Sequence, residues 1–155
     1  MKELSLIVSV IWIDLLFLII SKTGRFGTIV QKWYKEFGIT AVFSDCLIII
    51  LGIYITFYLF PNVSTFELVI YAIMIQIIHD LSLYYFVILQ LPTNTNKIID
   101  IFKEYAQENS YKPIIADSAM IGSSILLYKY LEHKNKDLVS FLGFLGFYLI
   151  TYMIY

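Results

Sequence analysis

Five apolar segments, each about as long as a membrane-spanning helix, dominate the pattern of hydrophobic and polar positions. A helix that crosses a bilayer needs about 20 consecutive, largely apolar residues. Five segments meet this requirement, separated by polar or proline-containing stretches: 4–21, 39–60, 66–90, 113–131 and 138–155. The pattern therefore predicts an all-α integral membrane protein, with a bundle of five transmembrane helices in a single domain over 1–155.

A sixth, shorter helix is expected between the third and fourth spans. Asn96 is a suitable N-cap for a helix over 97–109, and Pro113 suits the first turn of the span that follows. Apolar side chains fall on one face of this short helix, which is typical of a helix lying in the membrane interface. They are Ile98, Ile101, Phe102 and Tyr105.

Composition excludes most other classes. Of the 155 residues, 59% are hydrophobic and only 15% charged, whereas about a quarter of a soluble domain is charged. A net charge of −1, with 7 Gly and 3 Pro, excludes disordered, collagen-like and basic nucleic-acid-binding chains. The single cysteine, Cys46, excludes a disulfide scaffold, a CxxC redox pair and a cysteine-rich zinc site.

Lysine and arginine are unevenly divided between the two sides of the predicted bundle. Four lysines lie on the side of the N-terminus, and seven basic residues lie on the opposite side. The positive-inside rule then places the N-terminus outside and the C-terminus in the cytoplasm. In the first loop, basic residues interleave with Trp33 and Tyr34, and we expect this loop to meet anionic headgroups and no nucleic acid. The basic residues of the richer side are Lys22, Arg25, Lys32, Lys35, Lys97, Lys103 and Lys112.

Four of the five spans contain an aspartate at a similar depth from the Lys-rich side. At about 1.5 Å per residue, these carboxylates fall in a layer roughly 6–15 Å below one surface, which also contains a histidine. Ionisable groups inside a span are costly and often mark ion or proton pathways. We predict that they form an ion- or proton-binding cluster: Asp14, Asp45, His79, Asp80 and Asp117.

Polar neighbours at helical spacing extend this cluster, although a structural role stays open for each aspartate. Gln76 and Tyr84 flank Asp80 at i−4 and i+4, and Ser124 follows Asp117 along one stripe; we predict that these three support the site. Asp45 and Asp117 lie close to helix ends, where a carboxylate can also complement the helix dipole or reach headgroup water. The deeper Asp14 and Asp80 could instead pair with His79 or a lysine.

Three functional classes fit such a cluster. It could bind a cation or exchange protons, which is our first hypothesis. It could fix helix packing in a structural or assembly protein. It could also hold a divalent cation in an intramembrane enzyme that modifies lipids; no GxGD, HExxH or GxSxG motif occurs, and no catalytic residue is assigned. The expected partners are the lipid bilayer and either a second copy or other membrane proteins.

Three short strings resemble segments of uncharacterised multi-span membrane proteins of large double-stranded DNA viruses. They are Gln76-Ile77-Ile78-His79-Asp80-Leu81, Ile99-Asp100-Ile101-Phe102-Lys103-Glu104-Tyr105-Ala106 and Ala116-Asp117-Ser118-Ala119-Met120, and the similarity runs from about Phe37 to Leu131. The resemblance implies a virion or infected-cell membrane as the location and viral membrane proteins as partners. It implies no activity.

Overall fold

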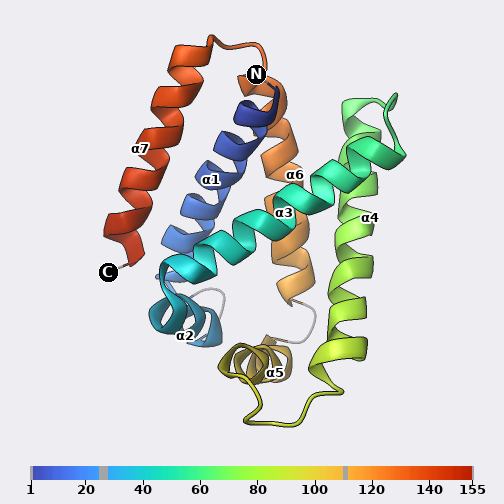
Figure 1. Ribbon diagram of the computed structural model, residues 1–155, viewed down its shortest axis with the longest axis vertical. Coiled ribbons are helices and arrows are strands. Elements are labelled where there is room, and N and C mark those ends of the chain that lie inside the picture. Colours follow the sequence, from blue (N-terminus) through green and yellow to red (C-terminus); the bar gives the residue numbers. More distant parts are fainter. Residues whose placement is uncertain (1, 25–27, 110–111, 155) are drawn as a thin grey trace.

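All regular secondary structure in the described part of the chain is helical (Figure 1). The computed structural model describes residues 2–24, 28–109 and 112–154. Its elements are α1 (Lys2–Ser21), α2 (Thr28–Phe37), α3 (Ile39–Leu59), α4 (Thr65–Leu83), the π-helical turn η1 (Tyr84–Ile88), α5 (Lys97–Asn109), α6 (Lys112–Leu131) and α7 (Lys136–Ile154). Arg25, which we counted for the orientation, and Tyr155, the predicted end of the last span, lie outside the described residues.

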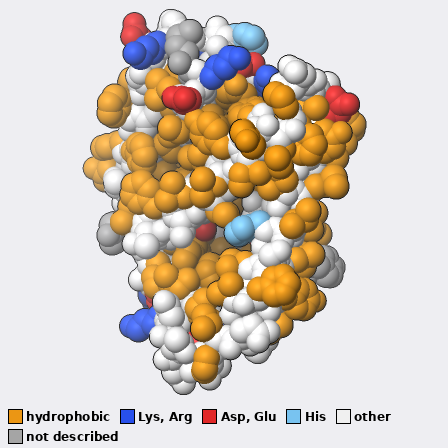
Figure 2. Space-filling model, turned by 45° about the vertical axis from the view of Figure 1, so that its right-hand side comes forward, with side chains coloured by type: hydrophobic (Ala, Val, Ile, Leu, Met, Phe, Trp, Pro, Cys, Tyr) orange, Lys and Arg blue, Asp and Glu red, His pale blue; other side chains and the backbone are white. Residues whose placement is uncertain are grey.

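Five of these helices are long and apolar enough to cross a membrane: α1, α3, α4 continued by η1, α6 and α7. They match the five predicted spans, with ends that differ by one or two residues. Their outer surfaces carry large apolar side chains, among them Phe66, Phe86 and Phe144, which are 74%, 77% and 77% exposed. A continuous apolar surface of this kind is compatible with a multi-pass membrane protein (Figure 2).

Helix α1 is the central element of the bundle. It lies between α6 and α7 and also packs against α3 (Figure 1). Its contact with α7 is close because α7 presents Gly143 and Gly146, where an added Cβ would lie 3.0 Å from Val8 and 2.8 Å from Ile11. Small residues at a helix interface let two backbones approach in this way.

The first loop contains a helix that we did not predict. Thr28–Phe37 forms α2, and our treatment of this stretch as a basic loop was wrong. The signal was present in the sequence, since Ile29, Trp33 and Phe37 recur at helical spacing. Gly38, with φ of 51°, allows the sharp corner between α2 and α3.

Helices α2 and α5 lie side by side at one end of the bundle (Figure 1). The bounds of α5 and its Asn96 cap are as predicted: the Ile98 N–H donates to Asn96 Oδ1 at 2.8 Å. The Lys32 ammonium of α2 bonds to the Glu104 carboxylate of α5 at 2.6 Å. The rings of Trp33 and Phe102 pack with centroids 5.2 Å apart. We call this pair of amphipathic helices the α2–α5 platform.

Candidate functional site

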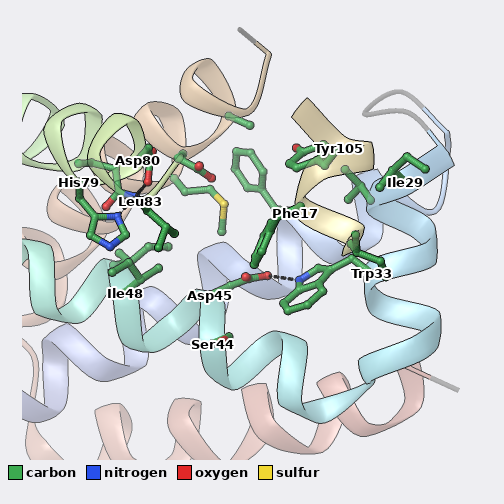
Figure 3. Close-up of a pocket in the computed structure, with 18 of the residues that line it drawn as sticks. Phe17, Ile29, Trp33, Ser44, Asp45, Ile48, His79, Asp80, Leu83 and Tyr105 are labelled. Carbon is green, nitrogen blue, oxygen red and sulfur yellow. Dashed lines mark hydrogen bonds and ion pairs between the residues drawn. The ribbon is translucent and has the colours of Figure 1, made fainter. Parts of the chain in front are cut away.

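A cavity of about 330 Å³ lies between the α2–α5 platform and the spanning helices α3, α4 and α6. Figure 3 shows His79 and Asp80 on one side of it, Trp33 and Tyr105 on the other, and Asp45 between them. The cavity brings together four of the five predicted cluster residues, from three spans. Its polar and aromatic lining residues are Phe17, Trp33, Tyr34, Ser44, Asp45, Gln76, His79, Asp80, Phe102, Tyr105 and Asp117.

Asp45 links α3 to the platform. Its Oδ2 atom accepts hydrogen bonds from the Tyr34 hydroxyl at 2.8 Å and from the Trp33 indole N–H at 3.3 Å. Burial, and then the nearby Asp45 carboxylate, raise the pKa of the Tyr34 phenol well above its usual range. Tyr34 is therefore a hydrogen-bond donor throughout the physiological pH range.

Asp80 is held by its own helix. Its Oδ1 atom accepts from the Gln76 amide at 2.7 Å and lies 3.1 Å from His79 Nδ1. Gln76 is buried, and its side-chain oxygen lies against Gly52 of α3, where an added Cβ would be 3.5 Å away, an ordinary contact distance. The second oxygen, Oδ2, is buried and has no hydrogen-bond partner within the described residues.

Asp117 enters the cavity from α6. It lies within electrostatic range of Asp80 and Asp45, so the three carboxylates share one local field. Tyr105 of α5 faces the same region (Figure 3). Burial and then the Asp117 carboxylate raise the pKa of the Tyr105 phenol above its ordinary value, which leaves this hydroxyl protonated at neutral pH.

Asp14 differs from the other predicted cluster residues because it does not line the cavity. Its side chain is 0% exposed, and neither carboxylate oxygen has a hydrogen-bond partner within the described part of the chain. It lies within electrostatic range of Asp45. Asp14 is thus a buried, unpaired group outside the cavity lining.

Two of the three predicted supporting residues also lie elsewhere. Gln76 contacts Asp80 as expected, but Tyr84 and Ser124 do not line the cavity. Tyr84 begins the π-helical turn and packs edge-on against Tyr85, and Ser124 is fully buried in α6. A shared helical stripe with an aspartate therefore does not establish that a residue lines the cavity.

The aromatic half of the site was missed from the sequence. Trp33 and Tyr34 were expected at the headgroups, and Tyr105 was placed only on the apolar face of an interfacial helix. In the structure all three line the cavity. The i, i+4 pattern of the first loop could have revealed α2, but not that α2 turns its aromatic face towards the aspartates.

Within residues 2–24, 28–109 and 112–154, no group of three or more His, Cys, Asp or Glu side chains is placed to hold a metal ion. A divalent cation at the Asp/His cluster stays a prediction. Comparisons with protein-family models, curated proteins and solved structures found no match to this chain.

Proposed function

We propose that this is a small multi-pass membrane protein whose intramembrane pocket exchanges protons or binds a cation. The observation that supports the proposal is that three spans bring Asp45, Asp80 and Asp117, together with His79, into one cavity. The proposal includes the predicted orientation, with the N-terminus outside and the pocket towards the Lys-rich, cytoplasmic face.

Charge balance is the physical argument. None of the described residues that line the cavity is Lys or Arg. Three carboxylates in a space of low polarity cannot all stay ionised without compensation, because an unpaired buried charge is strongly unfavourable. The negative charge of the carboxylates must be neutralised by protons on the carboxylates or on His79, or by a bound cation. Proton and cation would then compete for the same oxygens.

Infrared spectroscopy of the protein in lipid bilayers tests the proton part directly. The C=O stretch of a carboxylic acid is separate from the bands of a carboxylate, and it shifts when the acid exchanges into D₂O. We expect pH-dependent carboxyl signals that lose amplitude in Asp45→Asn, Asp80→Asn and Asp117→Asn. Asp137→Asn, in the exposed first turn of α7, is the matched control and should leave the bands assigned to the three cavity carboxyls unchanged.

Asp14 provides an internal comparison. Because it is fully buried outside the cavity, its carboxyl signal should exchange into D₂O much more slowly than the signals of the three cavity aspartates. The proposal fails if no pH-dependent carboxyl signal is removed by the three cavity substitutions, or if those carboxyls exchange as slowly as Asp14.

A structural role is the second candidate, and the bonds of Asp45 favour it. This carboxylate joins α3 to Trp33 and Tyr34 of α2, so it could serve only to dock the platform. In that case Asp45→Asn would lower the unfolding midpoint while the remaining carboxyl signals stayed insensitive to pH. The viral resemblance would place such an assembly role in a virion or infected-cell membrane.

A further inference from the structure

The cavity has the size and the two-sided lining of a small-ligand site. Its volume of about 330 Å³ falls at the lower end of the range of ligand pockets, roughly 300–1,000 Å³. The carboxylates of Asp45, Asp80 and Asp117 line it, with Asp80 on one side and Asp45 between the two sides (Figure 3). Aromatic rings complete the lining: Trp33 and Tyr105 lie opposite Asp80 (Figure 3), and Phe17, Tyr34 and Phe102 also line the cavity. A bare metal ion needs no aromatic wall, so the lining suggests a larger cation.

Carboxylates facing aromatic rings are the chemistry that recognises organic ammonium groups. The faces of Trp and Tyr rings attract a cation within about 6 Å, and aromatic cages bind quaternary ammonium head groups in this way. A carboxylate adds the compensating charge. Here Trp33 and the Asp45 carboxylate lie next to each other in the lining, because the Trp33 N–H donates to Asp45 at 3.3 Å.

The mouth of the cavity lies among apolar side chains. Figure 2 shows a hollow bordered by hydrophobic residues, with a histidine and an acidic side chain at its edge. His79 lines the cavity, and its side chain is 39% exposed. Beside the lining residues, α3 and α4 present the exposed Leu47 and Ile78. A ligand with a hydrocarbon chain could therefore place its head group in the cavity and its chain against this surface.

We infer that the pocket binds an organic ammonium group, held between the carboxylates of Asp45, Asp80 and Asp117 and the rings of Trp33, Tyr34 and Tyr105. This inference rests on the proposed function and specifies its cation. The ammonium group can come from a membrane amphiphile or from a small water-soluble compound, and the experiment below separates the two sources.

Tryptophan fluorescence gives a local readout, because the chain has two tryptophans and only Trp33 lines the cavity. Trp12 lies elsewhere and donates its N–H to the Leu142 carbonyl at 3.0 Å. The Trp12→Phe variant reports on the cavity through Trp33 alone. The Trp33→Phe variant reports general partitioning into the bilayer through Trp12. Both are reconstituted in bilayers of neutral lipid.

The probe is tetradecylpyridinium, whose cationic pyridinium ring quenches tryptophan on contact. We expect saturable quenching of Trp33 at concentrations at which Trp12 is quenched weakly and without saturation. In the Trp12→Phe background, Asp45→Asn/Asp80→Asn should raise the half-quenching concentration about tenfold, because the cation loses two of its charge partners. Asp137→Asn should leave the half-quenching concentration unchanged.

N-methylpyridinium carries the same head group without the chain and distinguishes the two sources of the ligand. Weaker quenching by this compound identifies an amphiphile as the source, and equal quenching identifies a soluble ammonium compound.

Two results would overturn the inference. One is equal, unsaturable quenching of Trp33 and Trp12, and the other is saturable quenching of Trp33 that the double Asn substitution does not weaken. The infrared measurement keeps the two proposals apart. If the carboxyls titrate and pyridinium does not bind, only the organic ammonium ligand is rejected. If the carboxyls show no pH-dependent signal either, the proton-exchange function is rejected as well.

Discussion

The unpaired carboxylate of Asp14 predicts that an apolar residue at this position makes the protein more stable. Asp14 is 0% exposed, and both of its oxygens lack a hydrogen-bond partner within the described residues. An unsatisfied buried polar group costs about 1–3 kcal/mol. Asp14→Val removes that cost and places an apolar side chain between the buried Ile13 and Leu15. We expect the free energy of unfolding to rise by about 1–2 kcal/mol, after a small loss for a β-branched residue in a helix.

Asp80→Val is the matched comparison, because Asp80 has partners and Asp14 does not. Removing it leaves the buried Gln76 amide without its 2.7 Å acceptor, which should lower the free energy of unfolding by about 1–3 kcal/mol. Asp14→Asn should give no gain, since an amide is as unsatisfied as the acid. Reversible unfolding in mixed micelles measures all three variants. If Asp14→Val destabilises the protein as much as Asp80→Val does, Asp14 has an essential partner and our account of it is wrong.

Two further predictions concern the contacts that hold the site's framework. Gly146→Ala should lower the free energy of unfolding by about 1–2 kcal/mol, because its Cβ would lie 2.8 Å from the buried Ile11. At Gly122 an added Cβ would lie 3.6 Å from Val69 Cγ1, which is an ordinary contact distance. Gly122→Ala should therefore be neutral or stabilising in the same unfolding assay. The Glu108 carboxylate of α5 caps α2 by accepting from the Thr28 and Ile29 N–H groups at 3.1 and 3.0 Å. Glu108→Ala should therefore cost about 0.5–2 kcal/mol of α2 stability, measured as faster amide hydrogen exchange over 28–37 with α1 unchanged.

The spanning helices could be predicted from the sequence because their signal is local. A run of about 20 apolar residues is enough to identify such a helix, and the same reasoning with the Asn96 cap gave the bounds of α5. Helix α2 was missed because Lys32, Lys35 and Glu36 interrupt its apolar positions and made the segment look like a loop. A pattern search at helical spacing over Thr28–Phe37 would have corrected this error without a structure.

The candidate site was predictable only in part, because depth in the bundle and direction around a helix are separate quantities. Depth can be counted along the sequence, and it placed Asp14 in one layer with Asp45, Asp80 and Asp117. Direction depends on how each helix packs. Asp14 belongs to the central helix α1, whose surface is covered by α3, α6 and α7, so its carboxylate is enclosed instead of opening into the cavity.

The packing of α2 and α5 explains why the cavity combines acidic and aromatic groups. The carboxylates come from the spans α3, α4 and α6, whereas Trp33, Tyr34, Phe102 and Tyr105 come from the platform. The amphipathic platform helices turn an apolar face towards the spans, and aromatic residues with a polar atom suit this position because they can cover apolar surface and still donate a hydrogen bond. Asp45 receives two such bonds. Docking the platform therefore encloses the carboxylates and supplies their donors in one step, so a change that loosens α2 should alter the pocket's chemistry even where it touches no aspartate.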